Sequence, residues 1–277
     1  MRESFEISLA FCWCLTDVAP EEGLQRVRAA GFDGIELWPD DLRRFGAQRW
    51  AGLLQNAGLR CVQLCPYFDF VSGTKSKGWN EEHFTEFLHA ALVMGCNRLR
   101  VFTGPPWGPG RIGSAQATVE QWTASILGLR EFCDVASEHG IELCLECHEG
   151  GLMDTSHGAL RLLHEVSSKN LTVNLQLPLV GEHWCDSVDR LAAYTRHIHL
   201  HNWTSGLGVG DLTFIDEGAF DWAPVLTRLR ERGCPSVCLS VEHATHDGRH
   251  DPLETVRRDG RYLSTLRNSV LRPTYAH

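Results

Sequence analysis

The chain has 277 residues, 43% of them hydrophobic and 22% charged, and its formal net charge at pH 7 is −9. This composition supports a large packed core, in one domain or in two small ones. The negative charge and the lack of any Lys- or Arg-rich block argue against nucleic acid or an anionic membrane as a partner, and no apolar run reaches the ~18 residues of a membrane span.

The N-terminal segment and the cysteines favour a cytoplasmic protein. Residues 7–12 follow two acidic residues and lack a small-x-small cleavage site, so we interpret them as a first strand and not as a signal peptide. The 11 cysteines lie scattered in apolar segments, as small buried side chains do in a reducing compartment.

Predicted strands and helices alternate along the chain. Short apolar runs predict strands over residues 7–12, 34–38, 60–65, 98–103, 141–147, 171–177, 197–203 and 236–242. Amphipathic runs predict helices over residues 20–30, 47–57, 80–94, 118–139, 156–167, 186–195, 222–232 and 252–266. Asn80 and Asp221 are expected to cap two of these helices.

This alternation predicts a single (β/α)₈ TIM barrel domain over residues 1–277. Strands that are separated by helices pair in parallel, and eight units of about 30 residues match the size of such a barrel. The alternative is a doubly wound open sheet, but no GxGxxG turn follows an early strand. Residues 68–79, 104–117 and 204–219 have no periodicity and would lie on the catalytic face of a barrel.

Histidines alternate along one predicted strand. His197, His199 and His201 point to the same face, because successive side chains of a strand face opposite sides. A single histidine on a strand is usually a core residue with satisfied ring nitrogens. Three histidines on one face need hydrogen-bond partners for six ring nitrogens, which a core rarely supplies, so we expect at least one of them to be functional.

Polar residues stand where several predicted strands end, which in a TIM barrel is where the active site lies. They are Glu36, Glu146 with His148, Gln176, His199 with His201, and Glu242 with His243. A carboxylate at the end of an apolar strand is costly unless it is paired or bound to a cation. Two carboxylates, one amide oxygen and one imidazole suit Mn²⁺ or Mg²⁺, with Co²⁺ or Zn²⁺ as alternatives; the competing interpretation of each Glu is a salt bridge to an arginine.

The chain resembles the xylose isomerase-like TIM barrel family, also called the sugar phosphate isomerase/epimerase group. The resemblance lies in residues 29–38, 138–148, 197–201, 217–222 and 239–243. It implies that Glu146, Gln176, His199 and Glu242 are the metal ligands and that Glu36 and His148 line a sugar pocket. The family usually has Asp where this chain has Gln176 and His where it has Leu179, so His183 and His201 are expected to replace the missing sugar contact.

The resemblance also implies proton transfer beside the carbonyl of a polyol, through an enediolate that a divalent cation stabilises. We expect Glu146 and Glu242 to be the acid/base pair as well as metal ligands. A sugar isomerase or epimerase is the first expectation. The same intermediate serves a lyase or dehydratase that acts on a keto-sugar, keto-glycoside or inosose by β-elimination, and the missing Asp and His favour that alternative.

Aromatic residues near strand ends suggest a ring-shaped carbohydrate or polyol as substrate, because aromatic faces pack well on sugar C–H groups. Those expected to bind it are Trp13, Phe68 and Trp107. A non-catalytic sugar-binding subunit is a further alternative, and its support is the loss of the Asp and the His. An abasic-site endonuclease shares the fold but needs more metal ligands and a basic groove. A homo-oligomer is expected on fold analogy alone.

Overall fold

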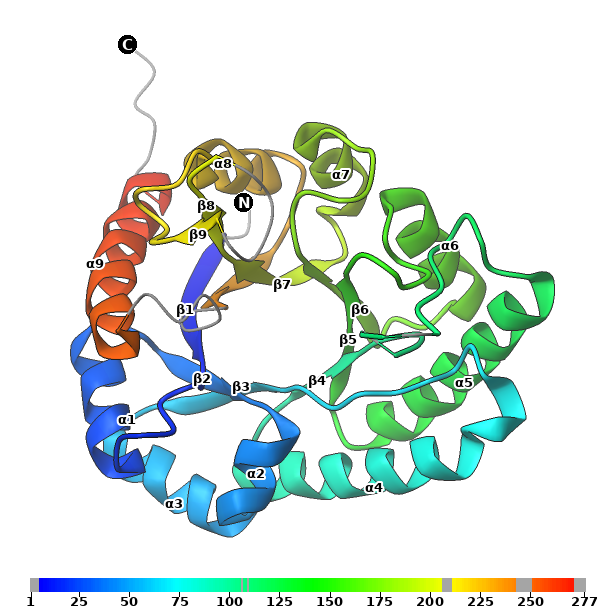
Figure 1. Cartoon of the computed structure of the whole chain (residues 1–277), viewed down its shortest axis with the longest axis horizontal. Helices are drawn as coiled ribbons and strands as arrows, with labels where there is room; N and C mark the ends of the chain where they lie inside the picture. The colour runs from blue at the N-terminus through cyan, green and yellow to red at the C-terminus, as the bar shows by residue number, and fades with distance from the viewer. Residues whose placement is uncertain (1–4, 106, 109, 206–210, 243–250, 272–277) are drawn as a thin grey trace.

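A closed barrel of eight parallel strands forms the centre of the molecule (Figure 1). The computed structural model describes residues 5–105, 107–108, 110–205, 211–242 and 251–271. The strands pair around the barrel in the order β1-β10-β7-β6-β5-β4-β3-β2, and β2 pairs with β1 to close it. Their bounds are β1 (Glu6–Cys12), β2 (Gly34–Leu37), β3 (Arg60–Leu64), β4 (Arg98–Val101), β5 (Glu142–Cys147), β6 (Leu171–Leu175), β7 (Thr195–Leu200) and β10 (Ser236–Val241).

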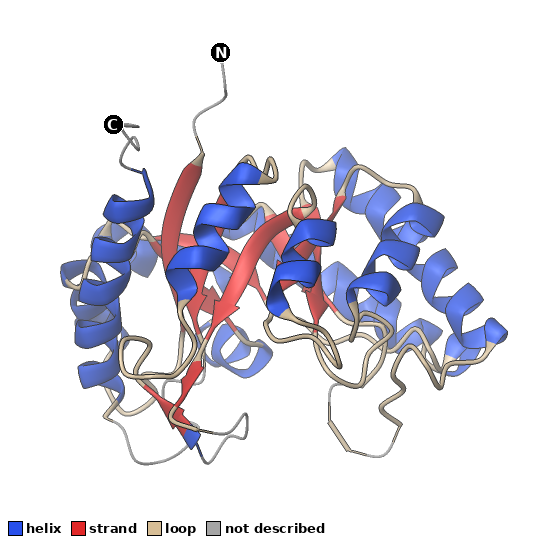
Figure 2. Ribbon diagram, turned by 90° about the horizontal axis from the view of Figure 1, so that it is seen from above, coloured by secondary structure: helices blue, strands red, loops and turns tan. Residues whose placement is uncertain are grey.

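Helices surround the barrel on the outside, as the side view also shows (Figure 2). They are α1 (Pro20–Ala29), α2 (Pro39–Phe45), α3 (Ala47–Ala57), α4 (Lys77–Met94), α5 (Val119–Glu138), α6 (Ser156–Val166), α7 (Trp184–Leu191), α8 (Trp222–Glu231) and α9 (Pro252–Leu271), with a short 3₁₀ helix at Gly73–Lys75. The TIM barrel predicted from the alternating pattern is therefore confirmed.

Strand alternation separates an apolar outer face from a polar interior. Outward residues such as Leu9, Leu99 and Leu143 are completely buried between the barrel and its helices, where they form most of the core. The alternate positions point into the barrel, and in the last layers before the C-terminal end they are mostly polar. The ladder places Glu146 beside Asn174, and Ser240 beside His199. The strands thus deliver polar side chains from distant segments to one axis.

Several details differ from the sequence-based predictions. Helix α2 was not predicted. The end of the strand predicted over residues 197–203 forms a separate strand, β8 (Asn202–Trp203), which pairs with β9 (Leu212–Thr213) in a stretch that was expected to have no periodicity. Asn80 does not cap α4, which begins three residues earlier. Its side chain instead accepts a hydrogen bond from the Asp69 amide and donates one to the Asp69 carbonyl, and it thereby holds the preceding loop. The predicted helix over residues 186–195 begins and ends earlier, as α7.

All 11 cysteines have free thiols, and most of them are buried, as expected. Among the described residues, no helix combines the length and the apolar character that crossing a membrane requires.

Candidate metal and active site

Three predicted metal ligands meet at the C-terminal end of the barrel. Glu146 lies in β5, His199 in β7, and Glu242 directly after β10. The Nδ1 atom of His199 is 3.1 Å from Oε1 of Glu146 and 3.4 Å from Oε2 of Glu242. All three residues are buried, and one ligand atom from each lies within 4.8 Å of the others. The sequence prediction that these side chains converge agrees with this geometry.

Glu36 lies on the other side of His199, and this is a correction to its expected place in a sugar pocket. Its carboxylate is completely buried and accepts hydrogen bonds from Nε2 of His199 at 3.1 Å and from Nε2 of His197 at 2.7 Å. The Gln63 amide also donates to it, at 2.9 Å. A carboxylate that holds one ring nitrogen of a histidine leaves the other nitrogen, here Nδ1, directed at the metal position.

Gln176 reaches the same cluster but presents its amide nitrogen. Its Nε2 donates to Oε2 of Glu242 at 2.7 Å. In this arrangement the amide neutralises part of the Glu242 charge without adding an oxygen ligand. Rotation of the amide by half a turn would exchange the two atoms, so its role as a fourth ligand stays a prediction.

The charges of the cluster separate the two carboxyl groups. Burial raises the pKa of Glu146, but the nearby charges of His199 and Arg100 outweigh it and lower that pKa to about 2. Burial also raises the pKa of Glu242, and there the net direction is upward although His199 opposes it. Burial lowers the pKa of His199, but the carboxylates around it raise the value well above the ordinary range. Without a cation, His199 therefore carries the positive charge that the carboxylates need.

Arg100 is a site residue that the sequence-based reasoning missed. Its side chain is buried, and its Nη1 donates to Oε2 of Glu146 at 3.1 Å. The guanidinium carbon lies 4.6 Å from the ring centres of Trp38, Tyr67 and Phe102. The signal was available, because Arg98 and Arg100 alternate along a predicted strand and must share one face.

A cavity of about 390 Å³ opens beside the cluster, with Gln176 in its wall. His148 and His201 line it, as predicted for residues that contact the substrate. His201 also lies 3.8 Å from Oε2 of Glu242, and its ring contacts the edge of Trp203. The volume lies at the small end of the range for small-molecule sites and suits one monosaccharide-sized compound.

Part of the cavity lining is apolar. It includes Leu177, Pro178, Leu179, Val180 and Leu212, and the same lining contains the carboxylates of Glu149 and Asp154. The sequence predicted that Leu179 replaces a histidine of the family, and Leu179 does line the cavity. The five apolar side chains offer no hydrogen-bond partner to a substrate hydroxyl.

Four other predicted contacts are not among the residues that line this cavity. Trp13 is 2% exposed and packs edge-on against Trp50 of α3, and Phe68 is 1% exposed among Phe70, Phe84 and Phe132. These two rings belong to the core and do not line the cavity.

His183 is exposed and caps α7, where its ring accepts a hydrogen bond from the Cys185 amide. Trp107 is exposed and contacts Tyr67. His243 lies outside the described residues.

The donor set fits a divalent cation. Two carboxylates and one imidazole converge on one buried position, with an amide beside them, and the remaining ring nitrogen of His199 is held by Glu36. Oxygen-rich sites with one nitrogen suit Mn²⁺ and Mg²⁺ and also accept Co²⁺ or Zn²⁺. Glu146, His199 and Glu242 are the residues that would hold the ion.

Comparison with known proteins gives one family and several relatives. A family model described as "Xylose isomerase-like TIM barrel" matches residues 24–266. The 3-dehydroshikimate dehydratase of Bacillus anthracis is 27% identical over 184 residues, and the match spans 63% of this chain and 63% of that relative, which is less than two thirds of its length.

Two solved structures superpose over almost the whole chain. The crystal structure of the probable 3-DHS dehydratase AsbF from Bacillus anthracis gives a TM-score of 0.76 at 20% identity and covers 93% of this chain and 98% of that chain. The crystal structure of D-allulose 3-epimerase from Methylomonas sp. gives a TM-score of 0.75 at 17% identity, with 96% of this chain and 100% of that chain covered. At these identities the two structures show a shared fold.

Proposed function

The chain belongs to the xylose isomerase-like TIM barrel family, and from this membership and its site geometry we propose a divalent-metal-dependent enzyme of carbohydrate-like substrates. The substrate is a small polyhydroxylated carbonyl compound, and the reaction begins with removal of a proton next to the carbonyl. The observation that carries this proposal is the buried cluster of Glu146, His199 and Glu242. Gln176 and His201, which contact Glu242, connect it to a cavity of about 390 Å³ that they line.

The ion proposed for the cluster is Mn²⁺ or Mg²⁺, with Co²⁺ or Zn²⁺ as alternatives. When bound, it would supply positive charge to the carbonyl and hydroxyl oxygens of the substrate and so make the neighbouring C–H bond more acidic.

The side chains of the chain divide the remaining work. Arg100 keeps Glu146 ionised, which suits a proton acceptor. The low pKa of Glu146 also makes this carboxylate a weak base in the metal-free site. In the metal-free site burial raises the pKa of Glu242. Its carboxyl group would release this proton when an ion binds, and it is the second member of the proposed proton-transfer pair. His148 and His201 are placed to hydrogen-bond substrate hydroxyls.

We propose elimination of water as the outcome. A proton leaves the carbon next to the carbonyl, the C–O bond at the following carbon breaks, the hydroxyl leaves with a proton as water, and a C=C bond conjugated to the carbonyl forms. The apolar part of the cavity lining, which includes Leu177, Leu179 and Leu212, supports this choice. A sugar with a hydroxyl on every carbon would leave unpaired groups there at about 1–3 kcal/mol each, whereas a ring with a methylene group would not.

The curated relative that acts as a 3-dehydroshikimate dehydratase points to the same reaction class. The second candidate is epimerisation or isomerisation of a ketose, which was the first expectation from the sequence. It is favoured by the pair of carboxyls on one cluster, which could remove and return a proton. A non-catalytic sugar-binding subunit would have no use for this buried charge.

One experiment distinguishes the candidates. The metal-loaded protein is incubated in D₂O with 3-dehydroshikimate, inososes and ketoses, while ultraviolet absorbance and deuterium incorporation are followed. Elimination extends conjugation: inososes and ketoses become enones that absorb in the ultraviolet, whereas 3-dehydroshikimate, already an enone, becomes a dienone that tautomerises to an aromatic diol and shifts its absorbance to longer wavelength. Epimerisation or isomerisation incorporates deuterium without such absorbance. Turnover should disappear in Glu146→Gln, and neither signal with any compound, in protein that contains metal, would contradict an enzymatic role in this substrate class.

A further inference from the structure

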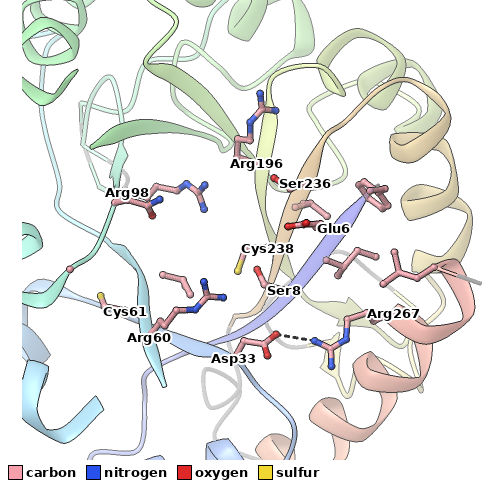
Figure 3. A pocket seen from close by; sticks show the side chains of 17 residues that line it. Glu6, Ser8, Asp33, Arg60, Cys61, Arg98, Arg196, Ser236, Cys238 and Arg267 are labelled. Carbon is pink, nitrogen blue, oxygen red and sulfur yellow. Dashed lines mark hydrogen bonds and ion pairs between the residues drawn. The ribbon is translucent and has the colours of Figure 1, made fainter. Parts of the chain in front are cut away.

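A second and larger cavity, of about 780 Å³, lies at the opposite end of the barrel (Figure 3). The first residues of four strands line it: Glu6 of β1, Arg60 of β3, Arg98 of β4 and Ser236 of β10. We call this cavity the N-terminal mouth. Conserved features at this end of TIM barrels usually serve stability, and the proposed reaction uses none of these residues. The volume lies well within the range of small-molecule sites.

Positive charge is concentrated in the N-terminal mouth. Four of the lining residues are arginines and two are acids, although the whole chain carries a net charge of −9. The arginines are Arg60, Arg98, Arg196 and Arg267, and the acids are Glu6 and Asp33. The excess of arginines over acids gives the cavity a net positive field, which its concave shape focuses on the space that it encloses.

The ion pairs leave part of this charge uncompensated. Asp33 already pairs with Arg267 at 2.9 Å and accepts the Leu9 amide at 2.9 Å. Arg98 donates from Nε and Nη2 to a single oxygen of Glu142, so its Nη1 donors remain available. The Arg60 side chain has no carboxylate partner within the part of the chain that the structure describes, and it is exposed to the cavity.

The close view shows how these groups are directed. The guanidinium groups of Arg60 and Arg98 both point from their strands toward the open centre of the mouth, where the hydroxyl of Ser8 and the thiol of Cys238 also lie (Figure 3). Arg196 points away from that centre, and its Nη1 donates to the carbonyls of Ala193 and Thr195. Hydrogen-bond donors thus face the centre, together with the carboxylate of Glu6 (Figure 3).

We propose that the N-terminal mouth binds a small oxyanion with two or more negative charges, such as a phosphate ester or a polycarboxylate. Arg60 and Arg98 contribute the forked donors that match phosphate and carboxylate oxygens, and Ser8 adds a hydroxyl. This anion site shares no residue with the metal cluster at the other end of the strands. Its test therefore gives the same answer whether or not the proposed function is correct.

The test measures binding by isothermal titration calorimetry on the full chain at constant ionic strength, with pyrophosphate and citrate as separate probes. Wild type should bind one equivalent of at least one probe, and the preferred probe identifies phosphate or carboxylate chemistry. Arg60→Gln should weaken binding by about tenfold, because it removes a charge-assisted pair worth about 1.4 kcal/mol. Arg26→Gln, an equal charge loss on the surface of α1, should bind as wild type does.

Two further variants make the result decisive. Glu6→Gln removes a lining carboxylate and should tighten binding. Glu242→Ala removes a metal ligand at the far end of the barrel and should leave binding unchanged, which separates the mouth from chelation of the catalytic ion by the probe. Undetectable binding of both probes, equal binding by Arg60→Gln, or loss of binding in Glu242→Ala would each overturn the proposal.

Discussion

At the scale of single residues, the candidate site depends on how His199 is held. Both of its ring nitrogens face carboxylates: Nε2 faces Glu36, and Nδ1 faces Glu146 and Glu242. An imidazole fixed on one side in this way cannot rotate without breaking a buried hydrogen bond. We therefore expect Glu36 to position His199 for a metal, although Glu36 does not line the cavity.

The variant Glu36→Gln tests this role. We expect metal affinity to fall by about 10- to 100-fold, the range for loss of a buried partner behind a metal-binding histidine. The measurement is the Mn²⁺ dissociation constant by calorimetry. Glu142→Gln, which removes a carboxylate that pairs with Arg98 at the other end of the barrel, is the matched control. If the two variants bind Mn²⁺ equally well, Glu36 does not position His199.

A substitution of Gln176 is expected to raise metal affinity, in contrast to Glu36→Gln. Gln176→Asp adds a third carboxylate beside Glu242, so the metal-free protein should lose stability through repulsion between like charges. With a divalent cation the extra charge becomes favourable, and we expect affinity to rise about tenfold or more. Mn²⁺ titration and thermal melts with and without EDTA measure both effects. Gln176→Asn has the same size without the charge, and equal results for the two variants would show that charge at this position does not control the metal.

At the scale of secondary-structure elements, strand alternation explains both what the sequence predicted and what it missed. Apolar runs of fixed spacing predicted the eight strands and placed Glu146, His199 and Glu242 at their ends. The same alternation puts Cys12 inside the barrel and Trp13 outside. Trp13 was predicted to bind substrate, but the residue that faces the interior is its neighbour Cys12. Phe68 lies in a loop, where no periodicity indicates direction.

The pairing of interior side chains was beyond prediction from one sequence. Arg100 contacts Glu146 across 46 residues, and His199 contacts Glu36 across 163 residues. Which interior groups touch depends on the stagger of the strands, and the register shifts at β2–β3 and β6–β7 alter it locally. The strand β9 and its antiparallel pairing with β8 were also missed, because each of these strands has only two residues.

The contact between α9 and the segment after β9 gives a prediction about pH. Asp259 is 2% exposed and accepts the Ile215 amide at 3.0 Å, and burial raises its pKa to about 7. The unfolded chain has an Asp pKa of about 3.9, so the folded state binds more protons between about pH 4 and pH 7. The free energy of unfolding should therefore fall as the pH rises through this window.

Asp259→Asn removes this titration and keeps an oxygen for the Ile215 amide. Its unfolding free energy should exceed that of wild type at pH 8, by at most about 4 kcal/mol, and the advantage should be smaller at pH 5. Urea unfolding at the two pH values measures it. Asp134→Asn, an exposed position on α5, should show no such dependence. An advantage for Asp259→Asn that is the same at both pH values would contradict the argument.

At the scale of the whole molecule, the barrel interior is unusual for its fold. TIM barrels are typically filled with Val, Ile and Leu. Here the buried interior contains Glu36, Glu146 and Glu242 against the one guanidinium of Arg100, with His197 and His199 between them. Three carboxyl groups against two cations, Arg100 and the protonated His199, leave a deficit of one positive charge at the axis that joins β2, β5, β7 and β10, and the raised pKa of Glu242 reflects it. A bound divalent cation would remove this deficit and connect the last three of these strands.

Metal removal should therefore destabilise the whole barrel and not only its active site. A cation that binds only the folded state adds about 2.7 kcal/mol at 100 times its dissociation constant, which corresponds to a rise in Tm of about 5 °C for a chain of this size. The measurement is thermal unfolding of chelated protein with Mn²⁺, Mg²⁺, Co²⁺ or Zn²⁺ added singly. Glu242→Ala should lose the shift, whereas Arg60→Gln, at the other end of the barrel, should retain it. A shift that survives in Glu242→Ala would place the stabilising ion outside this cluster.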